Sequence, residues 1–204
     1  MRKIFFIIIA SLFALPTFAG NGERIISKLV ENYKAQNGIS ANYVITTDQG
    51  NTTGQIVMQG NKFRMSSADL ICWYDGKTQW SYSTMTDEVC VTEPTDEELQ
   101  MVNPYSIISN FRHAFDAYLM KSGTESNHEV LMKPKTPKSS DIASVTVWVS
   151  KQKYLPMKIL FKMNDGTSIV IVMSNYKCKQ SFKPSTFTYD RSLVPEGTKV
   201  VDLR

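Results

Sequence analysis

The stretch CWYDGKTQWSYS, Cys72–Ser83, restricts the possible fold more than any other part of the chain. Asp75–Gly76 stands between two short runs that are rich in aromatic residues. This pattern is a strong signal for a β-hairpin, because a two-residue turn needs residues that tolerate positive φ. We therefore expect the two runs to pair, with Trp73 opposite Thr78. The hairpin carries more aromatic surface than two short strands can bury by themselves.

A second turn, near residues 85–86, extends the hairpin into a three-stranded meander. This turn sets Tyr82 opposite Val89 and Trp80 opposite Val91. Because side chains alternate between the two faces of a strand, the pairing sorts the large apolar residues onto one side. The predicted apolar face consists of Ile71, Trp73, Trp80, Tyr82, Val89 and Val91.

The same period of two recurs along most of the chain and marks thirteen candidate segments, the three of the meander included, from which we expect about ten or eleven strands. Outside the meander, the strand candidates lie within residues 41–46, 56–58, 63–65, 115–121, 128–133, 144–150, 156–163, 167–174, 182–189 and 199–203. The run SIVIVM, residues 168–173, carries β-branched and apolar residues on both faces, as in a strand that is covered on both sides. The fold class is mainly β, α+β: an incomplete antiparallel barrel or strongly curved sheet with short helices.

Two regions carry a helical pattern instead. Residues 23–36 place their apolar side chains on one helical face, and Asn37-Gly38 supplies a stop signal. Thr95 and Glu98 have the spacing of a capping box. A second helix start follows at Asn103-Pro104. The apolar stripe after this start consists of Ile107, Ile108 and Phe111. Two roles fit this stripe: a movable cover over the sheet, or an ordinary plug that fills it.

The first 19 residues have the pattern of a cleaved secretory signal peptide. A basic start is followed by an apolar run and by Thr17–Ala19, which gives a cleavage site at Ala19-Gly20. We therefore expect a single domain over residues 20–204 that is exported after removal of the signal peptide. Without Arg2 and Lys3 the mature chain has 21 basic and 19 acidic residues, a balance that does not indicate nucleic-acid binding.

No motif for catalysis, metal binding or cofactor binding is found in the sequence. The chain has two histidines without the spacing of metal ligands, so we expect no enzyme, no metal and no cofactor. Of the three cysteines, Cys72 and Cys90 are expected on strands with a third strand between them, roughly 9–10 Å apart, which is too far for a disulfide. Cys178 could pair with either, or all three could be free thiols.

The excess of aromatic surface leaves two interpretations. A curved sheet with few helices either packs shut on its own side chains, or leaves an apolar cavity that a guest molecule completes. In the second case, the residues expected to line the cavity are Phe63, Met65, Ile71, Trp73, Trp80, Tyr82, Val89 and Val91. Ile107, Ile108 and Phe111 would form the inner face of a lid over it.

The chain resembles the periplasmic lipoprotein carriers of the LolA family over nearly its whole mature length. The pieces that carry the resemblance are TGQIVMQGNKFRM (53–65), WYDGKTQWSYS (73–83), NPYSIISN (103–110), FKPSTFTYD (182–190) and VPEGTKVVDLR (194–204). The resemblance implies an incomplete antiparallel barrel with a helical lid, and an apolar cavity that carries the acyl chains of lipoproteins. The implied partners are an inner-membrane lipoprotein-releasing transporter as donor and an outer-membrane acceptor, and we expect a monomer.

One family feature differs here. Well-studied carriers have an Arg-Pro-Asn stretch before the Phe that matches Phe63, and its Arg holds the lid closed. This chain has Gln59-Gly60-Asn61 instead, and Arg64 points away from Phe63 by strand alternation. A related sheet serves as a lipoprotein-sensing regulator, so a non-enzymatic sensing or structural envelope module is the alternative to a carrier.

Overall fold

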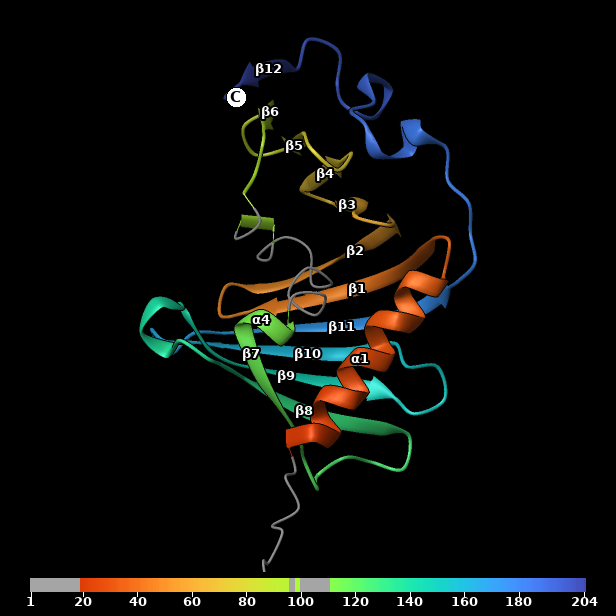
Figure 1. Ribbon diagram of the computed structural model, residues 1–204. Helices are drawn as coiled ribbons and strands as arrows, with labels where there is room; N and C mark the ends of the chain where they lie inside the picture. Colours follow the sequence, from red (N-terminus) through yellow and green to blue (C-terminus); the bar gives the residue numbers. More distant parts are fainter. Residues whose placement is uncertain (1–18, 96–97, 100–110) are drawn as a thin grey trace, which may run out of the picture.

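The computed structural model describes residues 19–95, 98–99 and 111–204. In this part of the chain, twelve strands form one curved sheet that does not close, and one long helix packs on it (Figure 1). The strand order is β12-β6-β5-β4-β3-β2-β1-β11-β10-β9-β8-β7. The predicted fold class, an incomplete and mainly antiparallel barrel, is thus confirmed.

The strands are β1 (Ile39–Thr47), β2 (Gly50–Gln59), β3 (Lys62–Ser67), β4 (Leu70–Tyr74), β5 (Gln79–Ser83), β6 (Glu88–Thr92), β7 (Phe115–Leu119), β8 (Asn127–Pro134), β9 (Ile142–Ser150), β10 (Pro156–Met163), β11 (Ser168–Lys177) and β12 (Lys199–Asp202). Two α-helices have both bounds within the described residues: α1 (Ala19–Ala35) and the single turn α4 (Phe111–Ala114). Three 3-10 turns are η1 (Pro137–Ser139), η2 (Pro184–Phe187) and η3 (Arg191–Leu193). The helix predicted over residues 23–36 is confirmed and begins four residues earlier.

The twelfth strand departs from the expected antiparallel pattern. Every neighbouring pair is antiparallel except β12 and β6, which are parallel, with Val200 opposite Val89. A parallel neighbour needs a long crossover connection, because the chain must return to the starting end of its partner strand. Residues 178–198, which we call the C-terminal strap, provide this crossover from β11 to β12 (Figure 1).

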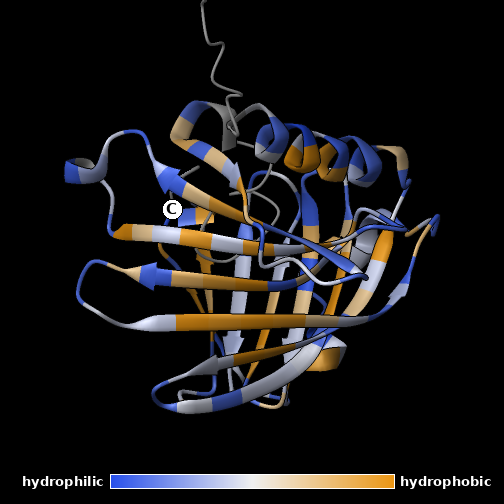
Figure 2. Ribbon diagram, turned by 90° about the horizontal axis from the view of Figure 1, so that it is seen from below, coloured by the Kyte–Doolittle hydropathy of each residue, from blue (hydrophilic) through white to orange (hydrophobic). Residues whose placement is uncertain are grey.

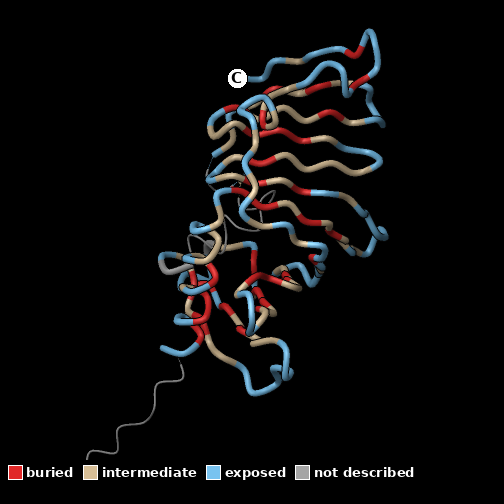
Figure 3. The backbone as a smooth tube through the Cα atoms, turned by 90° about the vertical axis from the view of Figure 1, so that its right-hand side faces the viewer, coloured by how far each residue is buried: buried red, intermediate tan, exposed pale blue. Residues whose placement is uncertain are grey.

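The sheet has an inner face, which we define as the face that packs against α1. Ile25, Ile26 and Leu29 of α1 join the inward side chains of most strands in one buried apolar cluster. Figure 2 shows α1 lying across the sheet, with hydrophobic positions on the helix and along the strands. Buried residues alternate with less buried ones along the strands in Figure 3, as expected where the two faces of a sheet differ in cover.

Helix α1 lies at one end of the inner face. Near its start, Gly22 packs so closely on β7 that a Cβ there would meet the Ala117 carbonyl oxygen at 2.4 Å. Near its end, the Tyr33 hydroxyl donates a hydrogen bond of 2.7 Å to the Gly60 carbonyl in the β2–β3 turn. Asn32 donates to the Lys153 carbonyl in the β9–β10 turn. These turns share one end of the sheet, so the opposite end of the inner face lies away from the helix.

The C-terminal strap covers part of the opposite face, which we call the outer face. Trp73, Tyr82, Val89 and Val194 form a second buried cluster there. The expected strand over residues 182–189 is wrong, because Pro184 lacks a backbone N–H and begins the 3-10 turn η2. The buried ring of Phe187 anchors the strap and meets Phe182 edge-to-face, with ring centroids 6.0 Å apart.

The turn of the aromatic hairpin is longer than expected. Trp73 pairs with Trp80 and not with Thr78, because the turn contains four residues, Asp75–Thr78. The Asp75 carboxylate accepts hydrogen bonds of 2.9 Å from the backbone N–H groups of Lys77 and Thr78. The correction moves the register by two residues, which preserves the face of every side chain.

Other pairings of the meander agree with the sequence analysis. Tyr82 lies opposite Val89 and Trp80 opposite Val91, as expected. Ser81 lies between Cys72 and Cys90 in the register, and all three cysteines are free thiols. The expectation that residues 168–173 are covered on both faces is wrong, since Val172 on the outer side of β11 is exposed.

Candidate functional site

The eight residues expected to line one cavity lie on two faces of the sheet. Phe63 and Met65 point to the inner face, where Phe63 is fully buried. The register pairs Met65 with Cys72 and Arg64 with Trp73, so Trp73 points the other way. The residues that share the outer face with Trp73 are Ile71, Trp80, Tyr82, Val89 and Val91. The expectation that all eight form a single lining is therefore wrong.

The outer-face aromatic residues are packed under the C-terminal strap. Trp73 is completely buried, and its ring meets Tyr189 of the strap. The Tyr82 hydroxyl donates to the Asp87 carboxylate at 3.2 Å, and the Thr198 hydroxyl donates to the same oxygen at 2.8 Å. These contacts explain the aromatic surplus of the hairpin: a segment more than 100 residues later covers it.

The inner face carries half-buried apolar side chains where α1 does not reach. Ile45 on β1, Met163 on β10 and Ile169 on β11 border the buried cluster at the end of the sheet away from the helix. Met65 on β3 is also half-buried against this cluster. We call these four residues the apolar margin. They come from four different strands of the sheet and share its inner face.

Most of the lid predicted from sequence lies outside the described residues. Ile107 and Ile108 lie outside the described residues, and of Phe111 only the backbone is described, in α4. The capping box that precedes this region is confirmed. The Glu98 carboxylate accepts a hydrogen bond of 2.8 Å from the Thr95 backbone N–H, and the Glu98 N–H donates to the Thr95 hydroxyl at 3.3 Å. Leu99 then packs against the inner cluster.

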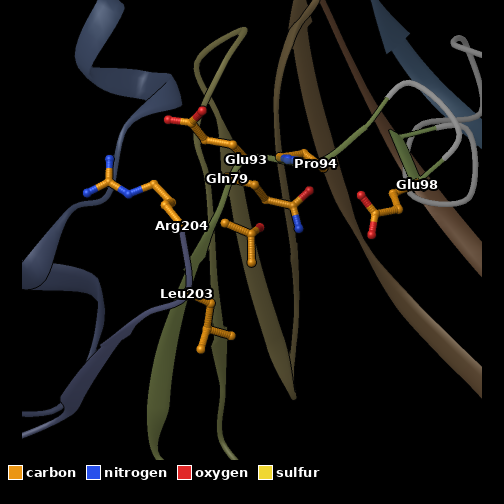
Figure 4. Close-up of a pocket in the computed structure, with 7 residues that line it drawn as sticks. Gln79, Glu93, Pro94, Glu98, Leu203 and Arg204 are labelled. Atoms are coloured by element: carbon orange, nitrogen blue, oxygen red, sulfur yellow. The ribbon is translucent and has the colours of Figure 1, made fainter.

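A polar pocket of about 500 Å³ lies beside this capping box (Figure 4). It is lined by Gln79, Thr92, Glu93, Pro94, Glu98, Leu203 and Arg204. Figure 4 shows Arg204 and Glu93 on one side of the pocket, Glu98 on the other, and Gln79 between them. Gln79 and Thr92 belong to the inner face, so the pocket gives the β5–β6–β12 part of this face a polar character.

Two carboxylates at or beside this pocket, those of Glu98 and Asp202, have a lowered pKa. Hydrogen bonds from the Thr95 backbone and hydroxyl lower the pKa of Glu98. Beside the pocket, hydrogen bonds from the Arg204 side chain and backbone lower the pKa of Asp202 to about 2. Glu93 forms a 3.1 Å ion pair with Lys77. The side-chain carbonyl oxygen of Gln79 is buried and has no hydrogen-bond partner among the described residues.

Sequence reasoning missed three of the four margin residues, Ile45, Met163 and Ile169. Their alternation was visible in the sequence, but many core residues alternate in the same way, so this signal did not distinguish them.

Within the described part of the chain, no three or more His, Cys, Asp or Glu side chains are grouped so that they could hold a metal ion. No helix among the described residues is long and apolar enough to cross a bilayer.

An open, curved antiparallel sheet with an apolar inner face under one helix defines an incomplete β-barrel. Residues 13–167 match the family model of the outer membrane lipoprotein carrier protein LolA, and the chain therefore belongs to this family. Membership of this family supports a lipoprotein-binding or carrier type of role, since LolA-like proteins are binding or carrier proteins.

One curated protein is similar to nearly the whole chain. A protein of Methanocaldococcus jannaschii, itself uncharacterised, is 26% identical over 206 residues, covering 96% of this chain. The chain spans 58% of the length of that curated relative.

Solved structures support the fold alone. A conserved protein from Thermus thermophilus, also uncharacterised, gives a TM-score of 0.61 at 11% identity, covering 89% of this chain and 99% of that one. A Vibrio parahaemolyticus domain described as an outer membrane lipoprotein-sorting protein gives 0.50 at 11% identity, covering 83% and 97%.

Proposed function

We propose that this protein is a non-enzymatic periplasmic carrier that shields the acyl chains of lipoproteins on its inner face. The observation that carries the proposal is the apolar margin: Ile45, Met65, Met163 and Ile169 stay half-buried beside a continuous apolar cluster. Burial stabilises by about 0.8 kcal/mol per CH₂ group, so a long acyl chain needs only partial contact with this surface to bind.

The two ends of a lipoprotein's lipid anchor differ in polarity, and so do the two parts of the inner face. Acyl chains fit the apolar margin between β1, β3, β10 and β11. The polar pocket at Gln79 and Thr92 would accept the hydrogen-bonding peptide that follows the lipid. This division allows one cargo molecule to satisfy both surfaces.

The route of the cargo is part of the same proposal. The protein would be exported with cleavage at Ala19-Gly20, receive lipoproteins from an inner-membrane releasing transporter and pass them to an outer-membrane acceptor. Ile107, Ile108 and Phe111 would cover the bound chains. Arg64 lies on the outer face, so it does not replace the latching Arg of well-studied carriers.

The test uses neighbouring residues that point to opposite faces of one strand. Ile45 belongs to the inner face and Val44 to the outer face of β1, and both are partly buried. A carboxylate at position 45 would stand in the acyl-binding surface, whereas at position 44 it would not. We would measure melting of wild type, Ile45→Glu and Val44→Glu with and without a synthetic triacylated lipopeptide. Ile169→Glu and Val170→Glu on β11 form a second pair.

A carrier predicts that the lipopeptide raises the melting temperature of wild type and of Val44→Glu, because a ligand of the native state stabilises it by mass action. The rise should be lost in Ile45→Glu. If the lipopeptide leaves wild type unchanged, the protein is a structural or regulatory module and the proposal is wrong. Equal losses in both variants would place the binding surface elsewhere.

A further inference from the structure

A second cavity of about 500 Å³ lies on the outer face, away from the apolar margin. Its lining residues are Ser40, Ala41, Asn42, Gln55, Ile56, Val57, Arg64, Ser66, Asn175, Tyr176 and Lys177. Ala41 and Ile56 belong to the inner cluster, so the side chains that face the cavity come from the alternate positions of β1, β2 and β3.

The register arranges the outward side chains in two adjacent rows. In the first row Lys177, Ser40, Val57 and Arg64 stand on four neighbouring strands. This places the Lys177 and Arg64 backbones three strand spacings apart, roughly 14 Å. In the second row Asn42, Gln55 and Ser66 stand side by side. The first row therefore has a cation at each end, and the second row places two amides and a hydroxyl beside it.

The lining of the cavity carries a net positive charge. The lining contains one arginine and one lysine and no aspartate or glutamate. Within the described part of the chain, neither Arg64 nor Lys177 forms an ion pair with a carboxylate. The pKa of Asp190 in the strap is lowered mainly by hydrogen bonds from Ser192. The positive charge of Arg64 lowers it further, by a smaller amount. The cavity thus favours a negatively charged ligand.

The backbone around the cavity holds its shape by specific features. The register of β1 against β11 shifts between the pairs Ser40–Lys177 and Asn42–Ser174, so β11 carries one extra residue in this interval, where Asn175 has a φ of 53°. Bulges re-aim side chains at functional places in sheets. The strap closes one side, where the Ser40 hydroxyl donates to the Gln180 side-chain oxygen at 2.6 Å. The polar groups are therefore presented from rigid elements.

We propose that this outer-face cavity binds an anionic carbohydrate. Asn and Gln side chains each offer donors and an acceptor, which matches the paired donor and acceptor character of sugar hydroxyls. The side chains of Asn42, Gln55 and Asn175 make no hydrogen bond with another described residue, so these groups are available. Arg64 and Lys177 supply the charge for a phosphate, sulfate or carboxylate group on the sugar. Among the outward-facing positions of β1, β2 and β3 at the cavity, Val57 alone is apolar, which favours a polar ligand over an acyl chain.

The probe for this site is trehalose 6-phosphate, with trehalose and inorganic phosphate as partial ligands. Isothermal titration should show that the sugar phosphate binds at least several times more tightly than either partial ligand. In ¹⁵N spectra the side-chain amides of Asn42, Gln55 and Asn175 should shift on addition. Lys177 is exposed, so Lys177→Gln should keep the fold and weaken binding about tenfold, as expected for a lost charge-assisted hydrogen bond.

Three variants separate the parts of the site. Arg64→Gln should weaken binding as Lys177→Gln does, and Gln55→Leu should reduce the affinity for trehalose 6-phosphate to that for inorganic phosphate. Lys158→Gln is the matched control, because Lys158 lies over the Trp148 ring on the outer face outside the cavity. Binding that is equal in Lys177→Gln, Arg64→Gln and wild type would overturn the proposal. So would an affinity for inorganic phosphate equal to that for the sugar phosphate.

This inference does not rest on the carrier function. The lipopeptide test uses inner-face residues such as Ile45, whereas the carbohydrate test uses outer-face residues such as Lys177. A protein that fails one test can pass the other.

Discussion

The Tyr189 ring of the C-terminal strap meets the Trp73 indole of β4 edge-to-face, with ring centroids 5.7 Å apart and ring planes at 84°. This contact fastens the strap to the outer face. It joins two residues that lie 116 positions apart in the sequence. An edge-to-face pair contributes about 0.5–1.5 kcal/mol beyond the area that it buries. The strap in turn positions β12, the edge strand, beside β6.

The contact predicts a difference between two substitutions of Tyr189. Tyr189→Ala removes the ring and should lower the free energy of unfolding by about 2–3 kcal/mol, less than a fully buried aromatic because Tyr189 is half-buried. Tyr189→Phe keeps the ring and removes a buried hydroxyl without a hydrogen-bond partner among the described residues, so it should be neutral or slightly stabilising. Urea unfolding followed by tryptophan fluorescence measures both. An equal loss in both variants would show that the hydroxyl has a partner.

The three thiols should differ in reactivity. Cys72 is buried on the inner face, and burial raises the pKa of its thiol to about 11, while the Ser81 hydroxyl donates to its sulfur at 3.6 Å. Because the thiolate is the reactive form, Cys72 should resist a thiol reagent such as DTNB at about pH 8 in the native state. Cys90 and Cys178 are only half-buried and should react first.

Unfolding in denaturant without reductant should then expose three reactive thiols per chain. Peptide mapping after alkylation identifies which cysteine was protected. A count of one thiol in denaturant would reveal a disulfide, and early labelling of Cys72 would contradict its burial.

His128 on β8 should make stability depend on pH. Burial is the main cause that lowers its pKa, and the charges of Lys151, Lys28 and Arg24 lower it further. The unfolded chain protonates this side chain at its ordinary pKa near 6.5, so at mildly acidic pH the unfolded state binds more protons. The contribution of neutral His128 is complete above about pH 6.5 and is lost as the pH falls through the lower folded-state pKa.

We therefore expect the melting temperature to fall from about pH 7 to about pH 5, and to fall less in His128→Gln. Calorimetry at several pH values checks this expectation. Above about pH 8, where His128 is neutral in both states, the difference between wild type and variant should become constant. If the two curves stay parallel over this whole range, the environment of His128 does not disfavour its charge.

Gly22 should be necessary for the close packing of α1 against β7. A Cβ at this position would meet backbone atoms of Ala117 and Tyr118 at 2.4–2.7 Å, and backbone cannot yield as a flexible side chain can. Gly22→Ala should therefore destabilise by about 1–3 kcal/mol, as overpacking does, although alanine favours helices. Glu23→Ala, at the neighbouring exposed position, is the control and should change stability by less than about 0.5 kcal/mol. A stabilised Gly22→Ala protein would contradict the close approach.

Local patterns in the sequence were sufficient for most elements. The period of two located at least part of each of the twelve described strands, and the capping box of Thr95 and Glu98 forms as its spacing predicts. The separation of Cys72 from Cys90 followed from counting strands. These features depend on neighbours within a few residues, where steric and hydrogen-bonding preferences act directly.

The tertiary structure decided which face each set of side chains serves. Alternation shows that Trp73 and Cys72 point to opposite faces, but it does not say which one meets α1. The register of β3 against β4 and the strap settle this: Phe63 faces Tyr74 on the inner side, and Trp73 lies under Tyr189. The site therefore could not be assigned from sequence, because both faces of these strands carry apolar residues. Which face becomes covered core depends on a segment more than 100 residues away, brought there by the crossover to a parallel β12.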